Sequence, residues 1–167
     1  FINLNQSLDI NPSNLFISNQ LVITENKIFV PTNNNLHILD LISGSSIFKK
    51  NFTSILKPLI FDNVMYAIDN NYLIAMEVEK GQILFSYDIN QKISEYLKIE
   101  KRKAKIKNLM FANNKVFIFL SNSYVLQFNR NGTLHSINRL PEKINSNPIF
   151  AENFIIFLNK KNKISII

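Results

Sequence analysis

The phrase "DLISGSSIF" occupies residues 40–48, and a similar phrase, "EVEKGQILF", occupies residues 77–85. In both, an acidic residue opens the phrase, Gly stands at its centre and Phe closes it. The 167-residue chain has only three glycines, and the third, Gly132, lies in a looser copy, "FNRNGTLHS". Because glycine readily adopts the left-handed backbone of tight turns, the phrase predicts one turn that is used three times, and hence a repeat protein.

The repeat keeps its register over a longer stretch. Aligning Gly44 with Gly81, an offset of 37 residues, superimposes the flanking sequence without a gap. An Asn marker recurs at positions 26, 63, 114 and 153, and it shares its long step of 51 residues with the glycines. The extra residues therefore form one insertion. We expect repeat units at 20–56, 57–107 (with a basic insertion at 92–107), 108–146 and, truncated, 147–167, after the end of a preceding blade at 1–19.

Each unit is predicted to contain four short strands. In the first unit they are "QLVIT", "KIFVPT", "LHILDL" and "IFKKN", separated by turns rich in Asn, Gly and Ser. Units of four antiparallel strands with a step near 40 residues are typical of β-propeller blades. The fold class is therefore all-β, a β-propeller portion of about four blades. A β-sandwich also has short strands, but it gives no reason for Asn and Gly to recur at a fixed register.

The phrases "LHILDLISGSSIF" and "LIAMEVEKGQILF" resemble the PQQ-like (quinoprotein-type) propeller repeat, a relative of WD40-like blades, with Phe48 and Phe85 in place of the usual closing Trp. Among proteins with this repeat, the chain resembles the BamB-like family of periplasmic outer-membrane assembly factors. The resemblance implies the C-terminal part of an eight-bladed scaffold lipoprotein that is periplasmic, associated with the outer membrane and bound to envelope proteins. The 26 Asn residues also suggest an AT-rich bacterial genome.

A half-propeller leaves two sheet faces open. We therefore expect one of three arrangements: a longer parent chain that supplies the remaining blades, self-association, or closure of the two ends into one shared blade of a four-bladed ring.

Catalytic chemistry has little support in the sequence. His37 and His135 fall at strand positions of different units, and we expect partly buried or surface strand residues rather than metal ligands. Asp40 and Glu77 are repeat-equivalent, which favours a structural role for both. The chain has no Cys and no Trp, so it offers neither thiolate chemistry nor the stacking Trp of a quinone cofactor site. We expect no enzyme activity, no cofactor and no metal.

The basic insertion is the feature that the repeat does not explain. Its sequence, "KISEYLKIEKRKAKIK", predicts either a short helix with Ile93, Tyr96, Leu97 and Ala104 inward or an extended strand pair. It supplies most of the net charge of +7, so the rest of the chain is nearly neutral, unlike a nucleic-acid-binding face. It is either a solvated loop or a contact for an acidic partner or anionic membrane headgroups. The candidate interaction residues are Lys98, Lys101, Arg102, Lys103, Lys105 and Lys107.

The sequence thus predicts a non-enzymatic propeller scaffold for protein–protein interaction in the bacterial envelope, in the assembly of outer-membrane β-barrel proteins. The alternative is that these are structural blades of a quinone-dependent dehydrogenase or a sensor whose active residues lie in another part of the chain.

Overall fold

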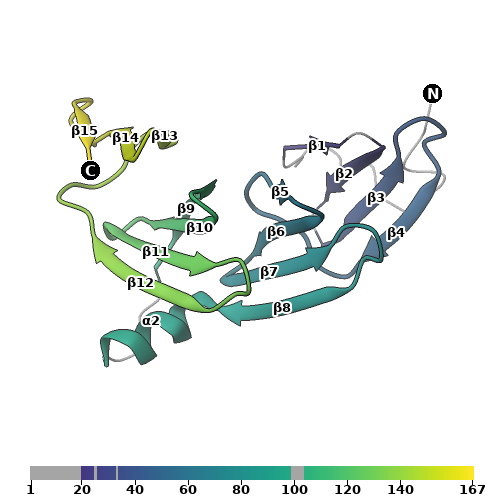
Figure 1. Ribbon diagram of the computed structural model, residues 1–167, viewed down its shortest axis with the longest axis horizontal. Coiled ribbons are helices and arrows are strands. Elements are labelled where there is room, and N and C mark those ends of the chain that lie inside the picture. Colours follow the sequence, from purple (N-terminus) through teal and green to yellow (C-terminus); the bar gives the residue numbers. More distant parts are fainter. Residues whose placement is uncertain (1–19, 25, 33, 99–103) are drawn as a thin grey trace. The chain divides into compact units, whose positions relative to one another are not determined.

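The computed structural model describes residues 20–24, 26–32, 34–98 and 104–167 (Figure 1). The predicted end of a preceding blade, residues 1–19, lies outside them. The chain divides into two compact units, Phe1–Ser86 and Tyr87–Ile167. Within the described residues, no helix has the length and hydrophobicity needed to cross a membrane.

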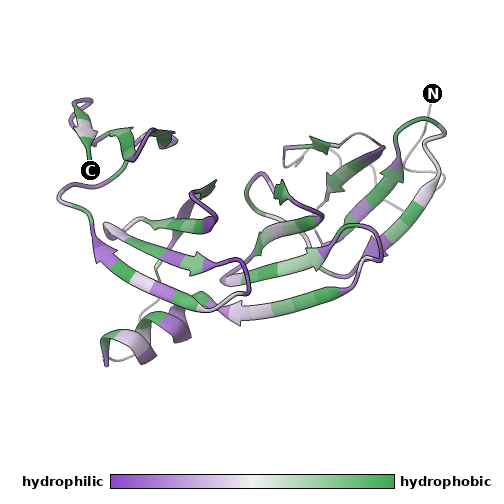
Figure 2. Ribbon diagram, viewed as in Figure 1, coloured by the Kyte–Doolittle hydropathy of each residue, from purple (hydrophilic) through white to green (hydrophobic). Residues whose placement is uncertain are grey.

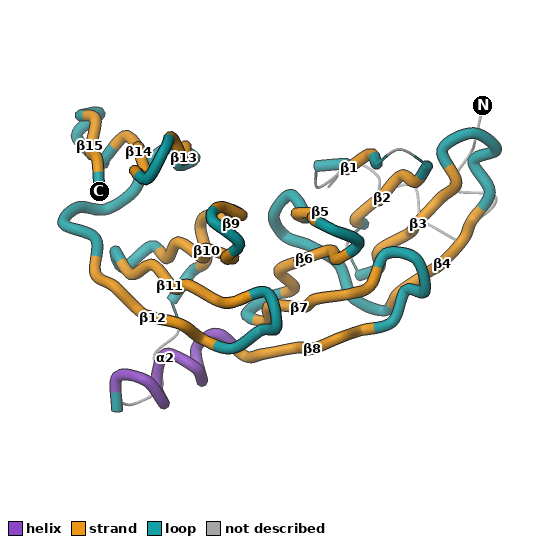
Figure 3. The backbone as a smooth tube through the Cα atoms, viewed as in Figure 1, coloured by secondary structure: helices purple, strands orange, loops and turns teal. Residues whose placement is uncertain are grey.

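The first unit holds two four-stranded antiparallel sheets, in which each strand pairs with its neighbours in the sequence (Figure 3). The strands of the first sheet are β1 (Val22–Ile23), β2 (Lys27–Pro31), β3 (Leu36–Asp40) and β4 (Ser46–Lys50). Those of the second are β5 (Leu59–Phe61), β6 (Val64–Asp69), β7 (Tyr72–Glu77) and β8 (Ile83–Asp88), the last of which crosses the boundary between the units.

After the end of β8, the described residues of the second unit form one helix and two more antiparallel sheets, of four and three strands. The helix is α2 (Ile89–Leu97). The four-stranded sheet contains β9 (Ile106–Ala112), β10 (Lys115–Leu120), β11 (Tyr124–Asn129) and β12 (Leu134–Arg139). The three-stranded sheet, which we call the terminal sheet, contains β13 (Ile149–Ala151), β14 (Phe154–Leu158) and β15 (Ile164–Ile166). The prediction of an all-β protein made of blade-like sheets is confirmed, with one helix among the described residues.

The three glycines occupy equivalent turns, as predicted. Gly44 lies between β3 and β4, Gly81 between β7 and β8, and Gly132 between β11 and β12. Their φ angles are 69°, 64° and 83°, in the left-handed region that favours glycine. In each turn the glycine N–H donates to the backbone carbonyl of the residue at the acidic position of the phrase, at 2.9 Å. The glycine follows the acidic position by four residues in the first two turns and by three residues in the third, so the phrase corresponds to one turn geometry in two sheets and to a turn one residue shorter in the third.

Asparagine takes the role of glycine in the shortest hairpins. The turn between β5 and β6 is Asp62–Asn63, and both residues have positive φ angles, 47° and 61°. The turn between β9 and β10 is Asn113–Asn114, with φ angles of 44° and 59°. Two consecutive left-handed residues match the twist of a tight antiparallel hairpin, and Asn and Asp tolerate this conformation better than most residues. Figure 2 shows the corresponding pattern, with hydrophobic residues concentrated in the strands and hydrophilic residues in the turns.

The core of the first unit lies between its two sheets. Side chains from β2 and β3 meet side chains from β6 and β7 in one apolar cluster. Its buried members are Phe29, Leu36, Ile38, Phe52, Met65, Ala67, Ile74, Met76 and Val78. The packing of one sheet on the next through alternate strand residues is the arrangement expected of neighbouring blades.

An ion pair joins the two sheets at the margin of this core. Lys27 of β2 is 5% exposed, and its Nζ lies 2.8 Å from Oε1 of Glu79, which follows β7. The Glu79 side chain is 60% exposed, so water screens one end of the pair. The buried Lys27 ammonium nevertheless depends on this carboxylate, because burying a charge without a partner is costly.

The closing aromatics of the two phrases are half-buried rather than enclosed. Phe85 lies on β8, where its ring centroid is 6.4 Å from that of Tyr66. Phe48 lies on β4 beneath the Lys50 ammonium, 5.2 Å from the ring centroid. A Cβ added at Gly81 would lie 3.0 Å from Lys50 Nζ and 3.3 Å from the Phe48 ring. The glycine turn of the second sheet is thus fitted closely against the fourth strand of the first.

Candidate functional site

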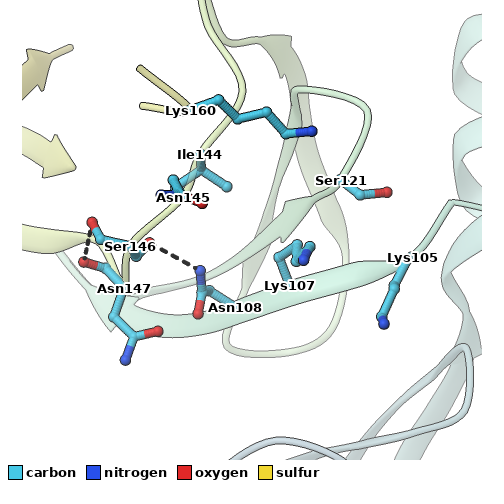
Figure 4. A pocket seen from close by; sticks show the side chains of 9 residues that line it. All are labelled: Lys105, Lys107, Asn108, Ser121, Ile144, Asn145, Ser146, Asn147 and Lys160. Atoms are coloured by element: carbon cyan, nitrogen blue, oxygen red, sulfur yellow. Dashed lines mark hydrogen bonds between the residues drawn. The ribbon is translucent and has the colours of Figure 1, made fainter. Parts of the chain in front are cut away.

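A pocket of about 440 Å³ in the second unit contains two of the basic residues singled out from the sequence. We call it the lysine pocket. Its walls come from the start of β9, the β10–β11 turn, the connection between β12 and β13, and the β14–β15 turn. The lining residues are Lys105, Lys107, Asn108, Ser121, Ile144, Asn145, Ser146, Asn147 and Lys160 (Figure 4).

Backbone hydrogen bonds hold the β9 side of the pocket in place. The Ser121 N–H donates to the Lys105 carbonyl at 2.8 Å, which ties the segment before β9 to the β10–β11 turn. The Asn108 side-chain amide donates to the Ser146 carbonyl at 3.3 Å, which bridges β9 to the opposite wall. These contacts fix the strand from which Lys107 projects.

The opposite wall is built from the terminal sheet. Leu158 of β14 accepts from the Asn145 N–H at 2.8 Å and donates its own N–H to Ser146 Oγ at 2.9 Å. The Lys160 N–H donates to the Lys143 carbonyl at 3.1 Å, so the β14–β15 turn is fastened to the connection that precedes β13. The pocket therefore lies between the β9–β12 sheet and the terminal sheet, and residues from several segments form its walls.

The lysine pocket is cationic. Three lysines line it, and no carboxylate does. Among the residues that the structure describes, no Asp or Glu lies within ion-pairing distance of Lys105, Lys107 or Lys160. Their side chains do not converge on one atom, because Lys105 points away from Lys160, which reaches over the pocket (Figure 4). Such a spread suits several anionic groups on an extended surface better than one small anion.

The structure describes three of the six candidate interaction residues. Lys105 and Lys107 line the pocket, and Lys98 is exposed at the C-terminal cap of α2 with a φ angle of 53°. Lys101, Arg102 and Lys103 lie outside the described residues. The sequence analysis missed Lys160, which belongs to a separate run, "KKNK", in the β14–β15 turn.

The insertion contains a helix, as one of the two alternatives predicted, but the helix begins earlier and faces differently. Helix α2 starts at Ile89, after Asp88, whose carboxylate accepts the Gln91 N–H at 3.1 Å as an N-cap. Ile93 and Ala104 are buried as predicted. The inward placement of Tyr96 is wrong, because its side chain is 50% exposed. With Ile89 filling the first buried position, the apolar stripe is offset toward the N-terminus of the helix and leaves Tyr96 in solvent.

The two histidines lie in different environments. His135 on β12 is exposed, within the range predicted. His37 on β3 is 0% exposed, so the prediction of a partly buried or surface position is wrong for it. Neither of its ring nitrogens has a hydrogen-bond partner among the described residues. Burial, and the nearby Lys49 ammonium, lower the pKa of His37 below 6.5 and favour the neutral ring.

The acidic residues of the repeat phrases have structural contacts. The Asp40 carboxylate accepts the N–H groups of Ile42 and Ser43, at 3.1 and 2.7 Å, and the Ser43 hydroxyl at 2.7 Å. The backbone hydrogen bond from Ser43 is the main reason why the pKa of Asp40 lies below its usual value. The described residues contain no group of three or more His, Cys, Asp or Glu that could hold a metal ion.

Comparison with known proteins identifies the fold. No protein-family profile and no curated protein sequence matches the chain. Solved structures do match: BamB from Moraxella catarrhalis has a TM-score of 0.70 and 11% sequence identity, over 89% of this chain and 42% of that one. The computationally designed Ika4 protein has a TM-score of 0.69 and 13% identity, over 90% of this chain and 89% of that one.

A third similar structure is the quinohemoprotein alcohol dehydrogenase ADHIIG from Pseudomonas putida, with a TM-score of 0.58 and 16% identity, over 74% of this chain and 21% of that one. The fold is therefore a BamB-like, PQQ-like β-propeller fold, as predicted. The chain spans less than half the length of the BamB structure.

Proposed function

We propose that this chain is a non-enzymatic propeller scaffold that binds an acidic surface of a partner protein through the lysine pocket. The observation that supports the proposal is the gathering of three lysines with no lining carboxylate into one pocket between two sheets. The three side chains are spread over the walls of the pocket, so they present positive charge to several anionic groups of a partner. Interaction sites of repeat folds commonly lie where loops of successive repeats meet, as the walls of this pocket do.

The basic insertion extends the proposed surface. Lys105 and Lys107 belong both to the insertion and to the pocket, so the pocket is continuous in sequence with Lys101, Arg102 and Lys103. Clustered exposed charge accelerates encounter with an oppositely charged partner more than it strengthens the final complex. We therefore assign the insertion to the capture of the partner and the pocket walls to its positioning.

The proposed setting is the bacterial envelope, and the proposed process is the assembly of outer-membrane β-barrel proteins. The support for this setting is the likeness of fold to BamB, together with repeat phrases that resemble the PQQ-like repeat and a chain that, among proteins with this repeat, resembles the BamB-like family. Envelope partner proteins with an acidic surface are accordingly the candidates for binding, ahead of anionic lipid.

The test is a charge-removal experiment with a matched control. The probe is a fluorescently labelled decaglutamate peptide, whose binding is followed by anisotropy at several salt concentrations. Replacing Lys105, Lys107 and Lys160 together by Ser should weaken binding about tenfold to a hundredfold, since each exposed ion pair contributes up to about 1 kcal/mol. The control removes the same charge from the exposed lysines of the first unit: Lys49, Lys57 and Lys80, each replaced by Ser.

The control variant should bind the peptide within about twofold of the parent chain. Binding should weaken as salt rises, because the Debye length falls from about 10 Å at 0.1 M to about 3 Å at 1 M. Equal losses in the two variants would contradict a role for the pocket and leave only non-specific attraction by net charge. Cosedimentation with phosphatidylglycerol vesicles tests the alternative that the pocket binds anionic lipid. If it does, the chain should bind the vesicles more tightly than it binds the peptide.

The competing assignment, structural blades of a quinone-dependent dehydrogenase, has one observation in its favour, the likeness of fold to ADHIIG. The peptide experiment distinguishes the two assignments. If these are structural blades of an enzyme, removal of the pocket lysines should weaken peptide binding no more than the control substitutions do.

A further inference from the structure

The β14–β15 turn carries positive charge that its repeat equivalents lack. The corresponding turns of the other three sheets contain only Asn, Ser and Thr, at residues 32–35, 70–71 and 121–123. The β14–β15 turn instead contains three exposed lysines, Lys160, Lys161 and Lys163. Lys160 lines the lysine pocket, and the other two extend beyond its lining (Figure 4). Turns at this place in the repeat thus form without lysine, which indicates a role for the charge outside folding.

A buried asparagine fixes the shape of this turn. Asn159 is 3% exposed, and its Oδ1 accepts the backbone N–H groups of Lys161 and Lys163, at 2.8 and 3.0 Å. Its own backbone N–H donates to the Lys163 carbonyl at 2.9 Å, and its carbonyl accepts the Asn162 N–H at 2.9 Å. Several backbone groups of the turn are therefore bonded to one residue, and the backbone that carries the lysines is held in one arrangement.

A carboxylate on the connection before β13 holds Asn159 in place. The Asn159 side-chain amide donates to Oε2 of Glu142, and the Ser165 hydroxyl donates to the same oxygen at 3.4 Å. Within the part of the chain that the structure describes, Glu142 forms no ion pair with a lysine. Its carboxylate therefore positions the turn through an amide and a hydroxyl, and the exposed ammonium groups of the turn stay unpaired.

We propose that the β14–β15 turn is the preorganised part of the surface that binds the acidic partner, with Asn159 as its positioning residue. This inference rests on the proposed function and extends the surface from the lysine pocket to Lys161 and Lys163. The partner that fits is an acidic protein segment with carboxylates spaced along it, because the turn adds charge beyond the pocket rather than inside it. The lysines should speed association, and the fixed backbone should slow dissociation, since less conformational freedom is lost on binding.

Charge removal tests the extension of the surface. Lys161→Ser with Lys163→Ser should weaken the binding of labelled decaglutamate about threefold to thirtyfold, chiefly through slower association in stopped-flow anisotropy. The matched control, Lys49→Ser with Lys57→Ser, removes the same charge from exposed positions of the first unit and should bind within about twofold of the parent chain. Equal losses in the two variants would overturn the extension.

Two variants test the positioning role of Asn159. Asn159→Ala keeps every charge, so association should be unchanged, while dissociation should quicken about twofold to tenfold through the lost hydrogen bonds. Asn159→Asp with Glu142→Gln exchanges donor and acceptor across their contact at constant net charge, and its dissociation rate should lie within about twofold of the parent rate. A merely structural role would lower the folded fraction and leave the dissociation rate unchanged. Parent-like dissociation in the Ala variant, or fast dissociation in the exchanged pair, would overturn the role of Asn159.

The pocket variant separates this inference from the proposed function. If replacing Lys105, Lys107 and Lys160 weakens binding while the turn variants bind like the parent chain, the inference is wrong and the proposed function stands. Parent-like binding by the pocket variant would instead contradict the proposed function.

Discussion

His37 supports the most informative prediction about stability. The imidazole is fully buried on β3, and neither nitrogen has a hydrogen-bond partner among the described residues. The repeat-equivalent residue, 37 positions later on β7, is Ile74, a buried core residue. Replacing His37 by Ile should therefore stabilise the protein. A buried unsatisfied polar group costs about 1 to 3 kcal/mol, so the free energy of unfolding near pH 8 should rise by about that amount.

The pH dependence provides a sharper test. The pKa of His37 is lowered in the folded protein, whereas in the unfolded chain it should be near 6.5. Well above pH 6.5 the ring is neutral in both the folded and the unfolded protein, so its titration does not change the free energy of unfolding. As the pH falls below 6.5, the unfolded chain takes up the proton first, and the parent protein should lose up to about 1.4 kcal/mol per pH unit until the folded pKa is reached. The Ile variant should lack this loss.

The assay is urea denaturation followed by circular dichroism, because the chain has no Trp, at intervals between pH 5 and pH 8. His135→Gln, at an exposed position, is the control and should leave the free energy of unfolding near pH 8 unchanged. A destabilised Ile variant would show that the imidazole makes a favourable polar contact. Parallel pH profiles for the parent and the Ile variant would show that His37 does not titrate differently on folding.

Three further substitutions test the contacts between the two sheets of the first unit, each by urea denaturation. Gly81→Ala should cost about 1 to 3 kcal/mol, because it forces a left-handed non-glycine residue and displaces the Lys50 side chain, and no loss would contradict that close fit. Glu79→Ala should cost about 1 to 3 kcal/mol by leaving the buried Lys27 ammonium unpaired, whereas a loss below about 0.5 kcal/mol would mean that water replaces the carboxylate. Phe85→Ala should cost about 1 to 2 kcal/mol, less than the roughly 3 to 5 kcal/mol of an enclosed aromatic, and a loss in that higher range would show that the ring is covered.

The sequence predicted the features that are governed by local backbone geometry. Gly44 and Gly81 could be placed in equivalent turns because a positive φ angle restricts the choice of residue there, and the restriction is visible without any tertiary contact. The acidic position was predictable for the same reason, since the Asp40 carboxylate binds backbone groups within its own turn. The sheet order followed, because short turns join strands that pair with each other.

The features that the sequence did not reveal depend on packing between segments. The burial of His37 was not predictable from its strand, because four of the five residues of β3 are buried and the strand therefore shows no polar face. Lys160 joins Lys105 and Lys107 only because the β14–β15 turn is fastened to the connection before β13. The start of α2 was missed although Asp88 is a suitable N-cap, because Ile89 could equally have continued the preceding strand.

The pairing of every sheet strand with its neighbours in the sequence has a consequence for biosynthesis. Each hairpin can form as soon as its second strand has left the ribosome, because no sheet waits for a strand that is translated much later. A hairpin closes in about 1 to 10 μs, whereas translation adds only about 5 to 20 residues per second. Each sheet should therefore be complete before the next is synthesised, which keeps exposed strand edges short-lived in the nascent chain. Most of the basic insertion, residues 92–105, falls between β8 and β9, so it separates two complete sheets and interrupts neither.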